Sequence, residues 1–258
     1  MINFIKTLIY KFLSFENYLR VLQRSYFLLY RTGLLKFSHL YDYHYYVKNL
    51  IKKGDTVIDI GANLGYYSIL FADWVGKQGK VYSVEPIQAY NKVFNEQAKK
   101  YTNITLYPNA LGAEEKKVKL VISSSATCYN TGLPHVYDSQ KDGDLNEQKF
   151  RFEAKMKRPS VLFQDLQQID YIKCDIEGFE YTVLADMIEL IERFKPIVQV
   201  EVWAENEEKL VALFKQSGYI PYKLYKNQLV EIEKLDKSIG GDYVFVHSIN
   251  YEQTSRKI

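Results

Sequence analysis

Hydrophobic and polar positions alternate in two distinct ways from about residue 54 onward. Short β-branched runs at Thr56–Ile60, Lys80–Val84 and Ile104–Tyr107 are typical of buried strands. The apolar residues between them recur at helical spacing over Leu64–Val75 and Ala89–Lys100. Strands that alternate with helices in this way predict a parallel sheet with helices on both faces and right-handed crossovers.

The rest of the chain continues the pattern less regularly. We expect helices over Phe179–Phe194 and Glu205–Gln216, and strands over Lys117–Ile122, Gln148–Met156, Tyr171–Cys174, Ile197–Trp203, Tyr219–Tyr225, Gln228–Glu233 and Tyr243–His247. Residues 123–149 are rich in Ser, Asn, Asp, Gly and Gln. A loop of this length within a compact domain is typical of a lid or a binding loop.

The N-terminal region differs from the rest in composition. Residues 1–46 hold 13 of the 39 aromatic residues, and residues 1–36 carry six basic side chains against one acidic side chain. Helical spacing appears over Ile5–Leu13 and Tyr18–Tyr30, and the second stretch carries a basic stripe of Arg20, Arg24 and Arg31. We therefore divide the chain into an N-terminal extension (1–50), a main domain (51–250) and a tail (251–258).

Two interpretations of the extension stay open. It is either a helical cap that packs on the sheet domain, or a helix that binds an anionic membrane surface.

Charge and cysteine content narrow the class of protein. The net charge of +3 predicts no nucleic-acid groove and hence no nucleic-acid partner. Cys128 and Cys174 lack metal-type spacing and fit a reducing compartment. We find no leader peptide, and no uncharged run approaches the ~20 residues of a membrane span. We expect a cytoplasmic protein, with peripheral contact at the inner face of the membrane as the alternative. The oligomeric state is not fixed by the sequence.

The densest chemical signal is a glycine-rich turn, Asp59-Ile60-Gly61-Ala62-Asn63-Leu64-Gly65, between a predicted strand and a predicted helix. Its glycines allow a sharp turn and the close approach of a ligand. Glu85 ends the next strand, 20 residues after Gly65, where a carboxylate accepts hydrogen bonds from ribose hydroxyls. Together these features predict a nucleoside pocket at the carboxyl ends of parallel strands.

The turn favours S-adenosylmethionine over a dinucleotide. Asn63 stands where the dinucleotide fingerprint has its middle glycine, and Ser68 follows in the helix. Asp59 would repel two phosphates but attract an amino group or a sulfonium. An NAD(P)-dependent oxidoreductase and a non-catalytic nucleoside-binding protein on the same fold are the alternatives.

Four segments together resemble the FkbM family of methyltransferases. They are Asp59–Gly65, Val84-Glu85-Pro86, Asn109-Ala110-Leu111-Gly112 and Ile172-Lys173-Cys174-Asp175-Ile176-Glu177-Gly178-Phe179-Glu180, and the likeness extends over about residues 40–248. It implies a Rossmann-like class I methyltransferase fold: an α/β domain with a seven-stranded, mostly parallel sheet whose last strand runs antiparallel. It also implies O-methylation of a sugar hydroxyl, on a surface polysaccharide or a lipid-linked oligosaccharide, or of another hydroxyl-bearing acceptor.

Candidate site residues follow from the motifs and the resemblance. The candidate cofactor-binding residues are Asp59, Gly61, Ala62, Asn63, Gly65, Ser68, Glu85, Asn109 and Ala110. The candidate catalytic residues are Asp175 and Glu177, just past a strand end, and Glu201, within a strand apolar enough to be buried.

The roles of the acids are left open at this point. Asp175 and Glu201 are candidates for a general base or for ligands of a divalent cation. Glu180 either takes part in the site or only favours the start of its helix. His44 and His135 are further candidate bases, although a lone histidine among tyrosines is more typical of packing.

Overall fold

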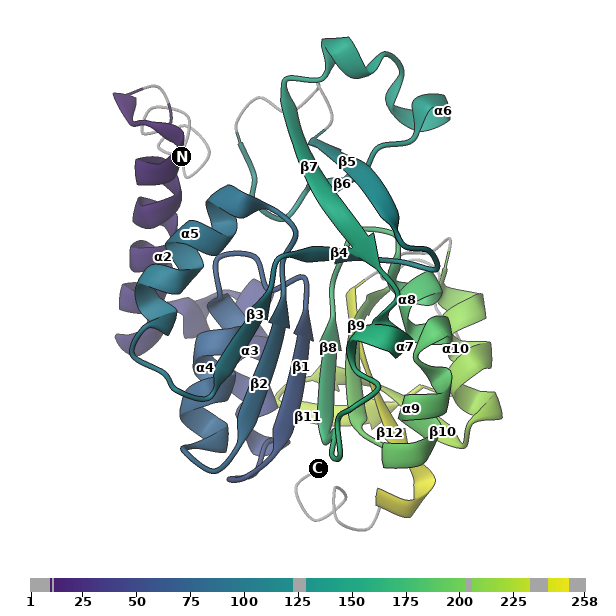
Figure 1. Ribbon diagram of the computed structural model, residues 1–258. Coiled ribbons are helices and arrows are strands. Elements are labelled where there is room, and N and C mark those ends of the chain that lie inside the picture. Colours follow the sequence, from purple (N-terminus) through teal and green to yellow (C-terminus); the bar gives the residue numbers. More distant parts are fainter. Residues whose placement is uncertain (1–9, 11, 123–128, 203–205, 233–240, 251–258) are drawn as a thin grey trace.

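The computed structural model describes residues 10, 12–122, 129–202, 206–232 and 241–250 (Figure 1). Its central sheet has the strand order β11-β10-β12-β9-β8-β1-β2-β3. The bounds of these strands are β1 Thr56–Ile60, β2 Lys80–Val84, β3 Ile104–Tyr107, β8 Tyr171–Cys174, β9 Ile197–Val202, β10 Tyr219–Tyr225, β11 Gln228–Glu231 and β12 Gly241–His247. Strands β1, β2, β3, β8 and β9 pair in parallel, and β12 runs antiparallel to β9 and β10. The predicted Rossmann-like, mostly parallel fold is confirmed.

Over the described residues the sheet has eight strands, instead of the seven that the resemblance implied. The additional strand is β11, which pairs antiparallel with β10 at the edge. Lys226 and Asn227 join the two strands with φ angles of 47° and 62°. Two consecutive residues with positive φ are typical of the tight hairpin turn that matches the twist of a sheet.

Helices cover both faces because the strand residues alternate between them. Val57 faces α3 (Asp42–Tyr46) and α4 (Tyr66–Val75), whereas Ile58 faces α8 (Glu180–Asp186), α9 (Ile188–Phe194) and α10 (Glu207–Gln216). Helix α5 (Gln88–Ala98) follows β2. The single helix predicted over Phe179–Phe194 is divided at Met187, where ψ is 1° and the side chain is fully buried in the core.

A second, smaller sheet lies over the carboxyl ends of the parallel strands (Figure 1). Its order is β4-β7-β5-β6, with β4 Asn109–Leu111, β5 Lys116–Ile122, β6 His135–Val136 and β7 Phe150–Lys157. Helix α6 (Ser139–Asp142) lies beside this sheet, whereas α7 (Pro159–Leu162), which follows β7, contacts α8. The predicted loop 123–149 therefore contains β6, α6 and a short turn at Leu145–Glu147, and residues 123–128 lie outside the described part. Its role as a lid stays a prediction.

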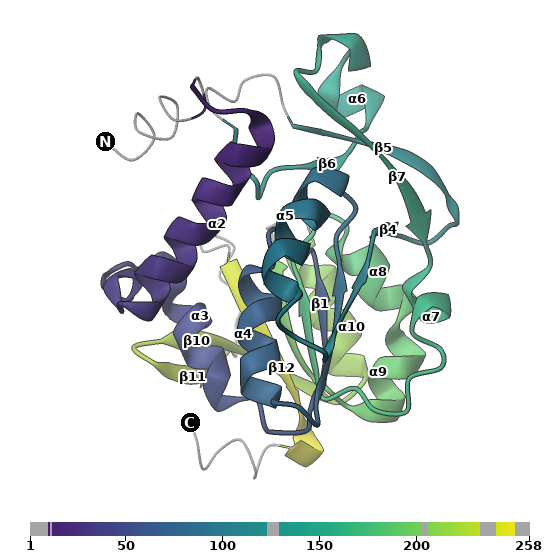
Figure 2. The same ribbon diagram turned by 60° about the vertical axis from the view of Figure 1, so that its left-hand side comes forward.

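The N-terminal helix α2 (Phe15–Arg31) packs on the sheet domain beside α5 (Figure 2). Tyr18 and Leu19 are fully buried in one core cluster with Leu64 and Tyr90. The cap interpretation therefore matches the packing of this helix. The helix predicted over Ile5–Leu13 falls mostly outside the described residues, as does the tail 251–258. Among the described helices, none is long and apolar enough to span a bilayer.

Candidate active site

The glycine-rich turn connects β1 to α4 and is locked in place by its neighbours. The backbone N–H groups of Gly61 and Ala62 donate to the carbonyl of Val84 at 3.0 and 2.9 Å. Gly61 has a φ of 82°, and a Cβ on it would lie 1.8 Å from the carbonyl oxygen of Asp175. Only glycine fits there, because both the backbone angle and the contact exclude a side chain. Gly65, at φ 81°, begins α4 against the ring of Phe94.

Asp59 is fully buried at the centre of the sheet and belongs to a row of polar side chains. Ser68 donates to its Oδ2 at 2.5 Å, and Ser83 donates to Ser68 at 2.8 Å. The Oδ1 atom has no hydrogen-bond partner among the described residues. Burial raises the pKa of Asp59. Asp59 therefore lies in the pocket wall, whereas Ser68 does not line the pocket and contacts it only by holding Asp59 in place.

Glu85 follows β2 and closes the other side of the turn. Its two carboxylate oxygens accept hydrogen bonds from the backbone N–H groups of Ile87 at 2.8 Å and Asn63 at 2.9 Å. Burial raises its pKa to about 7 despite these two bonds. Each oxygen keeps a second lone pair for a ligand. Glu85 is therefore a rigid acceptor whose orientation is set by the backbone.

One cavity connects these groups. Most of the candidate cofactor residues line it, and the second sheet contributes Asn109, Ala110 and Leu120 to its wall. Asn63, at φ 53°, donates from its side-chain amide to the carbonyl of Thr131 at 2.9 Å. Gly65 and Ser68 are the two candidate cofactor residues that stand behind the wall instead of in it.

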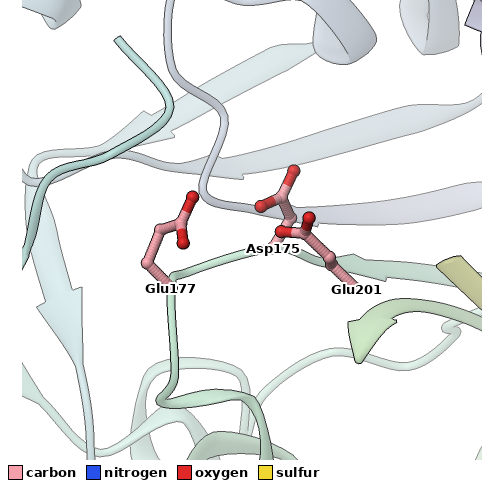
Figure 3. A group of neighbouring side chains, drawn as sticks. All are labelled: Asp175, Glu177 and Glu201. Atoms are coloured by element: carbon pink, nitrogen blue, oxygen red, sulfur yellow. The ribbon is translucent and has the colours of Figure 1, made fainter. Parts of the chain in front are cut away.

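Three carboxylates meet beside this cavity, from Asp175, Glu177 and Glu201 (Figure 3). One oxygen atom of each lies within 4.8 Å of the others. Asp175 and Glu177 follow β8, and Glu201 stands near the end of the adjacent strand β9. Figure 3 shows the carboxylates of Asp175 and Glu201 side by side, with Glu177 pointing toward them. The structure thus brings together all three acids that the sequence singled out.

The three acids differ in proton affinity. Burial alone would raise the pKa of Asp175, but the Lys173 ammonium and a hydrogen bond from Glu201 bring that pKa below its ordinary value. Burial and the charge of Asp175 raise the pKa of Glu201 to about 9. Burial, Asp175 and Glu180 raise the pKa of Glu177 to about 7. At neutral pH, Asp175 is ionised, Glu201 is protonated, and Glu177 is near its midpoint.

Glu180 shapes the loop that carries Glu177. It is fully buried, and its carboxylate accepts from the backbone N–H groups of Ile176 at 3.1 Å and Gly178 at 3.0 Å. Glu177 has a φ of 50°, which is unusual for a non-glycine residue. Glu180 therefore holds the turn that presents Glu177 instead of lining the pocket.

Lys173 is a site residue that the sequence reasoning missed. Its ammonium donates to Asp175 Oδ2 at 2.9 Å and lies 4.8 Å from the centre of the Tyr67 ring. Burial alone would lower its pKa, but Asp175, Asp59 and Asp242 outweigh burial and raise the pKa. The signal was a charged residue within the apolar strand Tyr171–Cys174, since such residues are rarely buried unless paired.

Both candidate histidines line the cavity, each with a partner. His44 stacks on Tyr67 with ring centres 4.1 Å apart, and its Nδ1 lies 2.6 Å from the hydroxyl of Tyr26. Burial and the nearby Lys173 lower its pKa to about 3, so His44 is neutral. His135 Nε2 lies 2.9 Å from Asp142 Oδ1. These contacts match the packing and hydrogen-bonding interpretation better than a free base.

A tyrosine network joins the second sheet to the N-terminal helix above the cavity. The hydroxyls of Tyr90 and Tyr129 lie 2.6 Å apart, and Tyr18 donates to the carbonyl of Tyr129 at 2.9 Å. Tyr90 also donates to the carbonyl of Thr131. Sequence reasoning missed Tyr90 and Thr131, because their contacts join segments about 40 residues apart and no local pattern signals them.

The strand order, the glycine turn and the acids at the strand ends define a Rossmann-like domain with a nucleoside-type pocket. The model of the methyltransferase FkbM domain matches residues 59–221, which is more than half of the 258-residue chain. The chain therefore belongs to the FkbM methyltransferase family. A search of curated proteins found no significant match.

Solved structures of methyltransferases are similar in fold. An FkbM methyltransferase from Methylobacillus flagellatus is 15% identical with a TM-score of 0.48, and the match covers 74% of this chain and 43% of that one. The present chain thus spans less than half the length of that relative. An S-adenosylmethionine-dependent O-methyltransferase from Thermotoga maritima is 13% identical with a TM-score of 0.43, and the match covers 80% of this chain and 64% of that one.

Proposed function

We propose that this protein transfers the methyl group of S-adenosylmethionine to a hydroxyl oxygen. The observation that carries this proposal is the order of the acids along the strand ends. Glu85 follows β2 on one side of β1, and the triad of Asp175, Glu177 and Glu201 lies beyond β8 on the other side. A hydrogen-bond acceptor for the ribose hydroxyls and an acceptor for the proton thus lie on either side of the turn on which the sulfonium would lie.

The pocket matches the chemistry of the cofactor at three points. Glu85 has free lone pairs for the ribose hydroxyls. Asp59 offers Oδ1, a buried acceptor, to the amino group of the methionine end. The acidic triad supplies negative potential near a cationic sulfur, which attracts it. Asn109 and Ala110 line the wall on the β2 side, where we place the adenine.

Methyl transfer breaks the sulfur–methyl bond and forms an oxygen–methyl bond. The electron pair of the broken bond stays on sulfur, and the hydroxyl proton leaves to a base. We assign this base to Glu177, because its pKa of about 7 suits proton removal at neutral pH. Asp175 orients the acceptor, and protonated Glu201 donates to Asp175.

A carbohydrate is the acceptor class that we favour. Carboxylates accept hydrogen bonds from sugar hydroxyls, and flat aromatic rings pack against the C–H faces of a sugar. The cavity offers both, because Tyr66, Tyr67 and Phe179 lie in its wall. Phe179 follows the acids closely in sequence, and Tyr67 is linked to them through its contact with Lys173. The resemblance to the FkbM family implies the same class.

The divalent cation at Asp175 and Glu201 stays a prediction. The three carboxylates lie close enough for one ion, but Asp175 already pairs with the ammonium of Lys173. Thermal unfolding with EDTA and then Mg²⁺ separates the cases. A bound ion predicts a Tm rise with Mg²⁺ that Glu201→Gln abolishes, whereas equal Tm values in both conditions remove the ion from the mechanism.

Calorimetry with S-adenosylhomocysteine and with NADH tests the proposal. We expect binding of S-adenosylhomocysteine, loss of at least about tenfold in affinity in Glu85→Ala, and no binding of NADH. The exposed Glu189→Ala serves as a matched control. Binding of NADH in place of S-adenosylhomocysteine would support the oxidoreductase alternative instead.

A transfer assay tests the reaction itself. Methyl-labelled S-adenosylmethionine is incubated with hydroxyl-bearing sugars and, in parallel, with amines. Label in the sugars supports the acceptor class, and label in the amines alone contradicts it. Cofactor binding without transfer to any acceptor would favour the non-catalytic alternative.

A further inference from the structure

One stretch of the N-terminal region carries large exposed apolar side chains that belong to none of the core clusters. Leu28, Leu34, Phe37 and Leu40 are 64%, 55%, 89% and 85% exposed. They lie within thirteen consecutive residues, from the last turns of α2 through the two 3₁₀ turns Leu34–Phe37 and His39–Tyr41. We call residues 28–40 the apolar ridge. Soluble surfaces scatter such residues singly, so their concentration in one short segment points to a binding surface.

Local geometry places Leu34 and Phe37 on a common face. Residues three apart eclipse one another in a 3₁₀ helix, which aligns Leu34 with Phe37 within the first turn. Gly33, with a φ of 78°, turns the chain at the end of α2. Leu35 is buried and anchors the ridge to the core cluster around Tyr26 and Phe27. The ridge is therefore a fixed part of the fold with its largest apolar groups directed away from the core.

Positive charge surrounds the ridge. Arg24, Leu28 and Arg31 fall at i, i+4 and i+7 on the exposed face of α2, so that the leucine stands between two guanidinium groups. Lys36 is exposed within the ridge itself. Between residues 24 and 48 there are four Lys and Arg against the single acid Asp42, which gives a net charge of +3. Asp42 in turn pairs with His39 at 3.0 Å.

We propose that the apolar ridge docks the protein on an anionic lipid surface. Leu34, Phe37 and Leu40 enter the boundary between headgroups and acyl chains, and Arg24, Arg31 and Lys36 contact the anionic headgroups. A concentration of protruding apolar side chains flanked by cations matches this partner better than a protein interface, where charged residues are depleted at the centre.

The arrangement differs from the basic stripe that the sequence suggested. Arg20, the first member of that stripe, pairs with Glu96 at 2.7 Å on α5 and faces the protein. The contact surface therefore lies at the end of α2 and in the turns beyond it. Helix α3 follows directly, and its His44 lines the cavity, so that docking brings the cavity wall to the membrane surface.

Vesicle co-sedimentation of the full chain tests this proposal. The vesicles contain phosphatidylcholine alone or with 30% phosphatidylglycerol. We expect binding to the anionic vesicles that weakens with added salt, because salt screens the headgroup attraction. Phe37→Ser combined with Leu40→Ser should lower the partition coefficient by at least about tenfold. Arg31→Glu combined with Lys36→Glu should lower it similarly, on the anionic vesicles only.

The control is Ile249→Ser, which removes another exposed apolar side chain (64% exposed) near the opposite end of the chain. It should bind like the unchanged protein. Deleting residues 1–36 is a poorer test, because it also removes the buried Tyr18 and Leu19. Circular dichroism and Tm establish that each variant is folded.

Three results would overturn the proposal. They are absence of binding to the anionic vesicles, equal binding by the ridge variants, and equal loss in Ile249→Ser. Sedimentation velocity adds a fourth: a dimer that Phe37→Ser dissociates, without vesicle binding, would assign the ridge to a second copy of the chain. None of these outcomes depends on methyl transfer.

Discussion

Glu177 shows how a single residue is prepared by its surroundings. Its backbone lies in the left-handed region, and Glu180 holds the turn on both sides of it through backbone hydrogen bonds. Such backbone strain costs about 1–3 kcal/mol and persists where the surrounding structure compensates for it. The side chain that results stands among other acids with a pKa of about 7.

If Glu177 is the base, the rate of methyl transfer follows its ionisation. Only the carboxylate accepts a proton, so kcat should rise with pH and level off above about 7. Glu177→Gln should lower kcat by about 10²–10⁴-fold and remove this rise, while the affinity for S-adenosylhomocysteine stays unchanged. A pH–rate profile of both proteins measures this. An unchanged profile in Glu177→Gln would show that Glu177 is not the base.

Glu201 should lower the stability of the free protein as pH rises. Its pKa in the folded protein, about 9, lies above the ordinary value of 4.5. The stabilising contribution of Glu201 to folding is therefore fully present below pH 4.5 and is lost as pH rises through about 9. Glu201→Gln keeps the hydrogen bond to Asp175 but carries no charge. We expect its Tm at pH 9 to exceed that of the unchanged protein by about 2–4 °C.

Thermal unfolding between pH 5 and pH 9 checks this expectation. Glu189→Gln, an exposed acid on α9, is the matched control and should leave the pH dependence unchanged. If the Tm of Glu201→Gln falls with rising pH as steeply as that of the unchanged protein, ionisation of Glu201 is not the cause of the loss.

Among single residues, the sequence pointed to those that belong to a local sequence motif. Asp59 lies near the end of β1, and Glu85 and Asp175 directly follow β2 and β8, where an acid beside an apolar run is conspicuous. Lys173 carries a similar signal, because it is a charged residue within an apolar strand. Thr131 carried no signal, because its backbone carbonyl is what the site uses.

At the scale of elements, α2 is an integral part of the domain. Gln23 is buried, and its side-chain amide donates to the carbonyl of Leu64 at 2.7 Å and of Val93 at 3.3 Å. Leu64 belongs to the glycine-rich turn, and Val93 belongs to α5. The helix therefore fixes the turn against α5 from outside the sheet.

Gln23→Ala should weaken both folding and cofactor binding. It leaves two buried carbonyl groups without this donor, which should lower the free energy of unfolding by about 1–3 kcal/mol. It should also reduce the affinity for S-adenosylhomocysteine, because the turn loses its support. Denaturant unfolding and calorimetry measure the two effects. Ser25→Ala, two residues along and exposed, should change neither; an equal effect there would place the cause in the helix and not in Gln23.

The pairing of elements was less predictable than the elements themselves. The sequence indicated strands near β5 and β7, since both alternate in polarity, but not that they join β4 and β6 in a separate sheet. β4 has three residues and β6 has two, which is too short for a periodic pattern. The break between α8 and α9 was missed because the apolar period continues across Met187.

At the scale of the whole molecule, the cavity joins three layers: the central sheet, the second sheet and the N-terminal region. Each layer supplies only part of the wall of the cavity. A ligand that binds the folded chain only should therefore stabilise all three layers together, as linkage requires.

We expect S-adenosylhomocysteine at 100 times its Kd to add about 2.7 kcal/mol to the free energy of unfolding. This should raise the Tm by roughly 5–11 °C in a single transition. Differential scanning calorimetry measures the shift, and Glu85→Ala should abolish it. Two separate transitions, with only one of them shifted, would show that the N-terminal region melts apart from the cofactor site.

The contact between Gly61 and the carbonyl of Asp175 has a consequence for engineering. A hydrogen on Gly61 is all that separates the cofactor turn from the loop that bears the acids. The cofactor turn and the acid-bearing loop meet at this one backbone contact, which we call the seam. Neither segment can be moved to widen the site without moving the other. Attempts to change the acceptor should therefore leave the main chain after β8 intact and exchange side chains in the second sheet, where Leu120 and Val136 face the cavity without touching that seam.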